Sequence, residues 1–338
     1  MGLTWTNLGN LQNVTASGGL ASLRLSTGWA YAGLLFVLSN TATSNLQAWS
    51  GTDTFRLKVN SRTILGDCPM NVIAAVQDAR KIGPRQAINT TLTGGISDYF
   101  TQSETFPLIA GLRNSSAGTN PAQTPAGAFF LNFGQDLTSP LPFRRSMTLN
   151  AGAKGISTVD VEIQMGAYTS PSVQVWAWAD KNPVQTEETE VVTMIQTTSL
   201  SCQNAGQNKF FNAIPGRVFR SLSFSNLTGV TEGFKLLVNG NEIANSVDAT
   251  ASNARFEIGQ AFTLATGQQG TSPSVTGFAG ATDTGLPRVV LQSIPFDAGG
   301  NVDNLFNLAG VQTDLTVLTD SVKSVLLVQE YVGNPLVD

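Results

Sequence analysis

Histidine is absent from this sequence of 338 residues. Its absence excludes serine or cysteine nucleophiles activated by imidazole, acid–base catalysis by histidine, and zinc sites that need an imidazole ligand. Paired carboxylates and calcium sites built from oxygen ligands remain compatible with the composition. For a chain of this length we count the absence of histidine against an enzyme, and we expect no organic cofactor.

Cysteine is nearly absent, and charge is scarce. Cys68 and Cys202 are too few for a disulfide framework, so we expect two buried or partly buried free thiols, as in a reducing cytoplasm. Only 12% of residues are charged, against about 25% in a typical soluble domain. A surface of Ser, Thr, Asn, Gln and Gly suits a protein that packs against copies of itself, or an extracellular β protein. The net charge of −4 and the lack of a basic stripe predict no direct binding of nucleic acid.

Long apolar runs are missing as well. The longest, from Trp29 to Leu38, is shorter than the roughly 20 residues that span a bilayer and is typical of a buried strand. The N-terminus lacks the basic stretch and apolar core of a signal peptide. We therefore expect a soluble protein that assembles inside a cell.

What the sequence does contain is strand patterning. Val159–Met165 alternates strictly between apolar and polar residues, and Phe55–Val59 and Ser172–Trp178 follow the same period. Phe234–Val238 and Val325–Val328 are strand-like in the second half, and clusters of Gly, Pro, Ser, Thr and Asn separate the strands. The pattern predicts an all-β protein.

One segment departs from this pattern. Residues 71–81 place Val72, Ile73, Val76 and Ala79 on one helical face, and Gly83 with the proline that follows it ends the segment. We predict a helix-bearing insertion near residues 68–83.

An internal repeat indicates two related units. Both copies show Phe, a basic residue, Leu, a gap, Val-Asn and a later Ile, which is the pattern of a β-hairpin with a tight turn at the Asn. The matching residues are Phe55, Leu57, Val59, Asn60 and Ile64 in the first copy and Phe234, Leu236, Val238, Asn239 and Ile243 in the second.

Two further pairs of segments occur in the same order. Phe106-Pro107-Leu108 resembles Phe262-Thr263-Leu264, and Ser172-Val173 with Asn182-Pro183 resembles Ser324-Val325 with Asn334-Pro335. The first copy is longer mainly between Ile64 and Phe106, where the predicted helix lies. We therefore predict two tandem β-sandwich domains, residues 1–185 with the insertion and residues 186–338.

Candidate sites for chemistry are few. Asp297, Asn301 and Asp303 offer closely spaced oxygen atoms near two glycines and could hold a structural calcium ion, although an ordinary Asx turn is the commoner explanation. Trp176 and Trp178 share one face of a strand. Such a pair can stack on sugar rings, and we favour its use in a sandwich core or a subunit interface.

Basic residues gather at two places, which could contact anionic lipid headgroups, although an ordinary solvated face or a local salt bridge is the commoner explanation. They are Arg80, Lys81, Arg85, Arg144 and Arg145.

Two tandem β units over essentially the whole chain, together with the repeated hairpin, resemble the double jelly-roll major capsid proteins of tailless icosahedral viruses, many of them bacteriophages with an internal membrane. The resemblance implies two tandem jelly-roll sandwiches and a homotrimer of pseudo-hexagonal outline in the icosahedral capsid of a virion assembled in the host cytoplasm. It also implies contacts with minor capsid and vertex proteins and with an internal lipid membrane. Two alternatives stay open: a viral spike or fibre or a carbohydrate-binding tandem β-sandwich protein, and an enzyme on a β scaffold.

Overall fold

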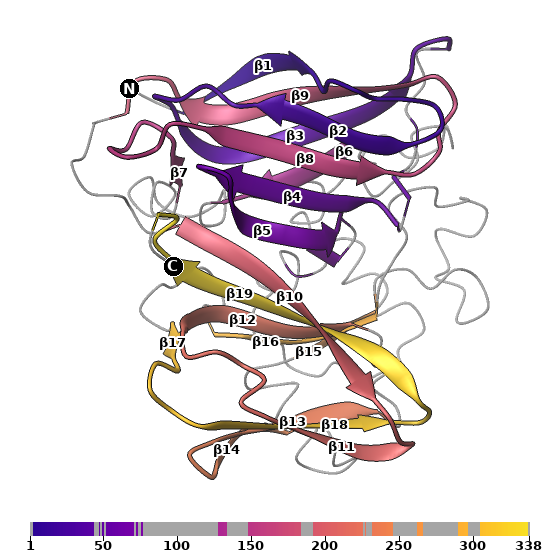
Figure 1. Cartoon of the computed structure of the whole chain (residues 1–338), viewed down its shortest axis with the longest axis vertical. Coiled ribbons are helices and arrows are strands. Elements are labelled where there is room, and N and C mark those ends of the chain that lie inside the picture. The colour runs from indigo at the N-terminus through magenta and orange to yellow at the C-terminus, as the bar shows by residue number, and fades with distance from the viewer. Residues whose placement is uncertain are drawn as a thin grey trace, which may run out of the picture.

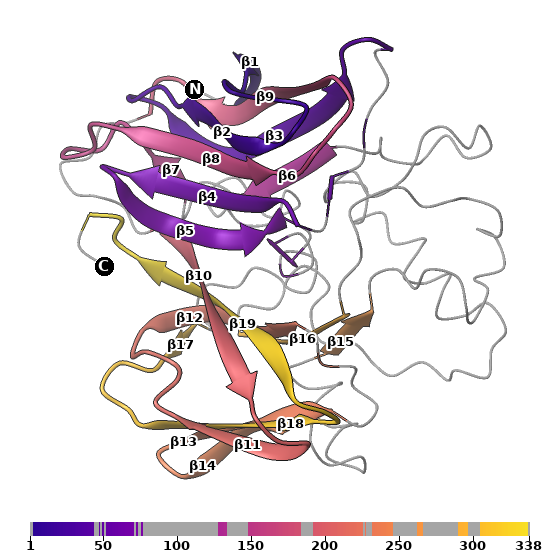
Figure 2. The ribbon, with the colours of Figure 1, turned by 45° about the vertical axis from the view of Figure 1, so that its right-hand side comes forward.

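The computed structural model is built almost entirely of β-strands (Figure 1). It describes residues 3–43, 47, 49–50, 52–70, 72–73, 76, 128–133, 148–183, 192–225, 227, 232–245, 262–265, 290–296 and 305–336. These residues form two β-sandwiches, which lie one above the other in Figures 1 and 2. The predicted all-β architecture of two tandem sandwiches is confirmed.

The first sandwich uses the strands β1 to β9. One sheet has the order β1-β9-β3-β6 with β7 paired to β3, and the other has the order β2-β8-β4-β5, all antiparallel. The bounds are Thr4–Asn10 (β1), Gly19–Arg24 (β2), Ala30–Asn40 (β3), Thr54–Val59 (β4), Arg62–Pro69 (β5), Ala128–Asn132 (β6), Leu149–Asn150 (β7), Val159–Met165 (β8) and Pro171–Asp180 (β9).

The second sandwich uses the strands β10 to β19. One sheet has the order β11-β18-β13-β14, and the other contains β10-β19-β12-β16-β15 with β17 paired to β12. The bounds are Val192–Cys202 (β10), Gly206–Phe211 (β11), Val218–Ser225 (β12), Gly233–Val238 (β13), Asn241–Asn245 (β14), Phe262–Ala265 (β15), Val290–Pro295 (β16), Phe306–Asn307 (β17), Thr313–Thr319 (β18) and Lys323–Gly333 (β19).

The two sandwiches have the same strand order. In their order across the sheets, β1, β9, β3 and β6 of the first correspond to β10, β19, β12 and β16 of the second, and β2, β8, β4 and β5 correspond to β11, β18, β13 and β14. Each sandwich therefore pairs strands distant in sequence in the same way, which is the arrangement of a jelly roll.

The sandwiches meet at the strands β5 and β10. These two terminal strands pair in parallel at Leu65 and Ile195, so one sheet runs from the first sandwich into the second (Figure 1). The chain passes from one sandwich to the other between β9 and β10. The predicted boundary between residues 185 and 186 lies outside the described residues and stays a prediction.

Aromatic rings fill both interiors, because inward positions of facing sheets are apolar. In the first sandwich Phe36 and Phe129 come from one sheet and Phe55 from the other, with ring centroids 5.4 to 6.1 Å apart. In the second, the rings of Phe224 and Phe234 stack across the sheets at 4.1 Å. All five are fully buried, so they anchor one sheet on the other.

The predicted helix is described only in part. Val72, Ile73 and Val76 have helical backbone and are buried, as the predicted apolar face requires. The rest of the segment, including Ala79, lies outside the described residues, and the helix-bearing insertion stays a prediction.

Candidate functional site

The repeated hairpin occupies equivalent strands of the two sandwiches. Phe55, Leu57 and Val59 lie on β4, and Ile64 follows on β5; all four are buried. Phe234 and Leu236 on β13 are buried as well, while Val238 and Ile243 are partly buried against the core. The apolar part of the repeat is thus the inward face of one hairpin in each sandwich.

The repeated Asn makes two equivalent hydrogen bonds in both sandwiches. Asn60 and Asn239 have positive φ angles of 48° and 49° at the hairpin turn, a conformation that Asn tolerates better than most residues. The backbone nitrogen of Asn60 donates to the Thr158 carbonyl, and the backbone nitrogen of Thr158 donates to Asn60 Oδ1 at 3.2 Å. Asn239 exchanges the same two bonds with Gln312, at 3.0 and 3.1 Å. Each Asn therefore ties its turn to the residue before the neighbouring strand.

Each sandwich also has a buried acid two residues before the repeated Phe, and each of these acids accepts a hydrogen bond from a backbone amide. Asp53 accepts a hydrogen bond at 2.7 Å from the amide of Gly166, the first residue after β8. Glu232 accepts one at 3.0 Å from the amide of Asp320, the first residue after β18. Both acids stand at the same spacing from the repeated Phe, but an acid before a strand is also typical of a turn, so their buried role was not predictable from the sequence.

An aromatic surface lies on the outward face of β1-β9-β3-β6. Trp176 and Trp178 are half-buried and point away from the core, whereas the alternating residues Val175 and Ala177 are buried and point inward. Of the two uses predicted for the tryptophan pair, the sandwich core is therefore wrong, and a subunit interface stays a prediction. Trp5, which is 50% exposed, lies 6.3 Å from the Trp178 ring and 5.8 Å from the Phe130 ring.

The packing of Gly33 and Leu35 and the scarcity of charge describe this outward aromatic face further. Gly33 lies beneath the Phe130 ring, since a Cβ atom at Gly33 would come within 2.4 Å of it. Leu35 is paired with both Trp176 and Phe130 on the neighbouring strands. The four strands carry one charged residue, Asp180, so the face is essentially uncharged, with Gln174 beside Trp176 as a polar neighbour.

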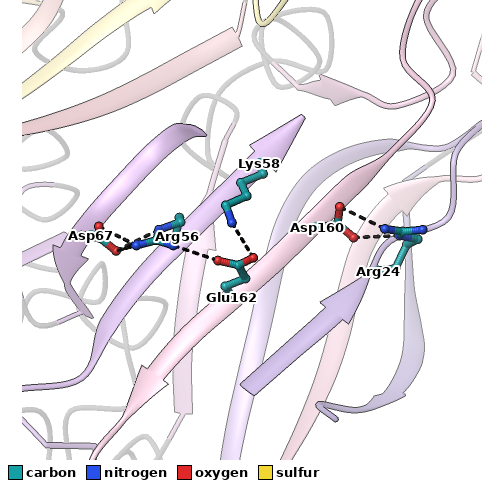
Figure 3. Close-up of polar contacts among 6 residues, drawn as sticks. All are labelled: Arg24, Arg56, Lys58, Asp67, Asp160 and Glu162. Carbon is teal, nitrogen blue, oxygen red and sulfur yellow. Dashed lines mark hydrogen bonds and ion pairs between the residues drawn. The ribbon is translucent and has the colours of Figure 1, made fainter. Parts of the chain in front are cut away.

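The other sheet of the first sandwich presents a charged outward face (Figure 3). Arg56 lies between Asp67 and Glu162, with N–O distances of 2.6 and 3.1 Å, and Lys58 reaches the other oxygen of Glu162 at 2.6 Å. The bond to Asp67 is the main cause that raises the pKa of Arg56 above its ordinary value. The chain thus has one charged and one aromatic outward face on a single sandwich.

Glu162 is the centre of this network, and we expect Glu162→Gln to lower the free energy of unfolding by about 1–2 kcal/mol, since it weakens two partly buried ion pairs. The matched control is Asp160→Asn on the same strand, whose partner Arg24 is 70% exposed. We expect a smaller loss for the control, because solvent screens that pair. Urea unfolding of both variants at equal protein concentration measures the difference, and equal losses would contradict it.

The remaining predicted sites lie mostly outside the described residues. These are the calcium candidates Asp297, Asn301 and Asp303 and the basic residues Arg80, Lys81, Arg85, Arg144 and Arg145. Among the residues that the structure describes, no cluster of His, Cys, Asp or Glu could hold a metal ion. The described helical residues include no segment with the length and hydropathy of a membrane-spanning helix.

The two cysteines are buried free thiols, as predicted. Burial raises the pKa of Cys68 far above its ordinary value, and burial is also the largest cause of the raised pKa of Cys202. Both side chains are therefore protonated at neutral pH and act as small apolar groups in the core.

Comparison with known proteins gives matches among solved structures. No family model and no curated protein sequence matches the chain. The major capsid protein P2 of bacteriophage PM2 matches with a TM-score of 0.58 and 14% identity, over 98% of this chain and 97% of that one. A chain from the atomic structure of Sulfolobus turreted icosahedral virus matches with a TM-score of 0.50 and 10% identity, over 100% and 92%.

These matches extend over both sandwiches. The fold is that of the double jelly-roll major capsid proteins of icosahedral viruses.

Proposed function

We propose that this chain is a non-enzymatic major capsid protein that forms the icosahedral shell of a virion from homotrimers of pseudo-hexagonal outline. The observation that carries the proposal is the match of the whole chain, both sandwiches included, to the major capsid protein of PM2. Two sandwiches with one strand order give each chain two equivalent units, so three chains supply six units, which fits a pseudo-hexagonal tile.

The composition supports the same function. With 12% charged residues and an uncharged aromatic face, the chain has surface suited to burial against other copies. In the proposed virion the partners are other copies of the chain, minor capsid and vertex proteins, and an internal lipid membrane. Assembly in the host cytoplasm agrees with the two free thiols.

Negative-stain electron microscopy of the purified chain at moderate salt tests this proposal. We expect compact, threefold or pseudo-hexagonal tablets that tile or close into shells. Monomers, or long thin trimers, would contradict it.

A carbohydrate-binding function is the second candidate, because Trp5, Trp176 and Trp178 are outward-facing aromatic rings. Stacking of sugars on such rings is a common mode of glycan recognition. Glycan binding that Trp176→Ala abolishes, by a chain that forms no tablets, would favour this candidate over the capsid.

A further inference from the structure

Three side chains of different chemistry meet on the hairpin of β13 and β14, at the lower end of the molecule in Figure 1. The Lys235 ammonium nitrogen lies 3.0 Å from Glu242 Oε2, and the side-chain amide of Asn245 donates to the same oxygen at 3.3 Å. One carboxylate oxygen therefore contacts both an amine and a carboxamide. These are the groups that an amide bond between Lys and Asn requires: a nucleophile, a carbonyl carbon and an acid–base group in contact with both nitrogens.

An irregularity in the pairing of β13 with β14 brings the three groups to one side of the hairpin. Successive residues of a strand point to opposite faces, so Glu242 and Asn245, three residues apart, would ordinarily lie on opposite faces. Among the pairs that the structure describes between the two strands, Ile243 has no partner on β13. This extra residue returns Glu242 and Asn245 to the same face, and Lys235 is the direct partner of Asn245 across the strands.

The surroundings of the three groups suit a reaction between them. Asn245 is 6% exposed, so its carboxamide is shielded from water, which would otherwise compete with the amine for the carbonyl carbon. The side chains of Lys235 and Glu242 are 37% and 32% exposed. The amine can therefore exchange protons with solvent, and a small leaving group can escape.

The equivalent hairpin of the first sandwich shows that the fold does not require these three groups. Counting from the repeated Phe, the equivalent of Lys235 is Arg56, which forms ion pairs with acids of β5 and β8 instead (Figure 3). A guanidinium stays protonated and is a poor nucleophile. The equivalent of Asn245 is Gly66, which has no carboxamide. The reactive set thus belongs to the second sandwich and is separate from the repeated core and turn residues.

We propose that Lys235 and Asn245 become joined by an intramolecular isopeptide bond, with Glu242 as the acid–base group. This modification site goes beyond the proposed function and does not depend on it. Glu242 takes a proton from the Lys235 ammonium, and the neutral amine attacks the side-chain carbonyl carbon of Asn245, which lies beside it.

The protons and bonds of this step balance without an oxidant or a reductant. As the bond from the carbonyl carbon to Nζ forms, Glu242 returns the first proton to Nδ2 of Asn245. The bond from the carbon to Nδ2 then breaks, and the departing ammonia carries away the second proton that Nζ loses. One ammonium group and one carboxamide become a secondary amide and an ammonium ion.

The bond fixes a terminal strand. In the part of the chain that the structure describes, β14 ends the order β11-β18-β13-β14 and has β13 as its one neighbour. Lys235 and Asn245 are the described pair farthest from the turn at Asn239, so their bond closes the open end of the hairpin. A strand closed at both ends neither frays nor separates to pair with another chain.

Mass spectrometry of the full chain after denaturation and tryptic digestion tests the bond. Trypsin does not cut after a lysine whose amine is acylated, so we expect residues 221–255 to remain one peptide that contains both Lys235 and Asn245. We expect its mass to be lower than the sequence gives by one ammonia molecule. Complete cleavage after Lys235, with neither product changed in mass, would overturn the proposal.

Two variants separate the isopeptide bond from other losses of ammonia. Lys235→Arg keeps a cation for Glu242 but removes the nucleophile, and we expect it to lose no ammonia; a loss that persists in this variant would show that Asn245 reacts by another route. Glu242→Gln keeps the size of the side chain, and we expect the bond to form about 10²–10⁴-fold more slowly, the usual effect of an acid–base group. An unchanged rate would remove Glu242 from the mechanism. Lys154→Arg, at an exposed position, is the control and is expected to form the bond like the parent.

Discussion

Replacing Phe55 by alanine is expected to lower the free energy of unfolding of the first sandwich by about 3–5 kcal/mol, the usual loss for a large aromatic side chain removed from a core. Phe55 is fully buried and contacts Phe36 and Phe129 of the facing sheet, with centroids at 5.4 and 6.1 Å. Loss of the ring leaves a cavity between two sheets, which cannot collapse without moving both of them.

Urea unfolding followed by tryptophan fluorescence measures this effect in the first sandwich specifically, because all five tryptophans lie between Trp5 and Trp178. The matched variant is Phe234→Ala at the equivalent position of the second sandwich. We expect Phe234→Ala to shift the transition seen by far-ultraviolet circular dichroism more than the transition seen by fluorescence. Val322→Ala, at a position 67% exposed, serves as the control. A loss below about 1 kcal/mol for Phe55→Ala would contradict the assigned role of the ring.

Much of the fold was predictable from the sequence, because inward and outward positions alternate along half-buried strands. The bounds predicted for Val159–Met165 are those of β8, and the segment from Trp29 to Leu38 coincides with most of β3. The repeated hairpin was recognisable because its Phe, Leu and Asn each have a fixed physical role: two are core contacts, and one adopts a left-handed turn. Such roles leave the same residue types at the same spacing in both copies.

The orientation of the tryptophan pair was not predictable. A period of two shows that Trp176 and Trp178 share a face, but Val175 and Ala177 on the opposite face are apolar as well. Both faces of β9 therefore read as candidates for the core. Only the facing sheet decides between them, and that sheet is set by pairings between strands distant in the sequence.

The buried polar strand β12 was unpredictable for a related reason. Ser221 and Ser223 are fully buried, although alternating serines on a strand normally indicate a solvated face. Ser221 donates a hydrogen bond to Glu330 at 3.0 Å, so the serine hydroxyl is satisfied within the protein. The strand is buried on both of its faces, which the alternation of residue types along it does not encode.

Asp53 joins three parts of the first sandwich through one buried carboxylate. Its Oδ1 accepts the Gly166 amide at 2.7 Å, and its Oδ2 accepts the Ser50 amide at 2.8 Å and a short hydrogen bond from the Tyr168 hydroxyl. Burial is the main cause that raises the pKa of Tyr168 far above its ordinary value, and the neighbouring Asp53 adds to it. The phenol is therefore protonated at neutral pH and available as a donor.

We expect Asp53→Ala to lower the free energy of unfolding of the first sandwich by about 3–5 kcal/mol, because the Gly166 amide and the Tyr168 hydroxyl lose their acceptor and the Ser50 amide keeps only the Tyr168 hydroxyl oxygen. Tyr168→Phe is the matched variant: it removes the hydroxyl that donates to Asp53 and accepts from the Ser50 amide at 2.6 Å, but it leaves both amide bonds to Asp53, so we expect a loss of about 1–2 kcal/mol. Urea unfolding followed by tryptophan fluorescence measures both. Equal losses for the two variants would show that Asp53 stabilises the sandwich through Tyr168 alone. A larger loss for Asp53→Ala, as expected, assigns most of the effect to the amides of Ser50 and Gly166, which hold the start of β4 against the end of β8.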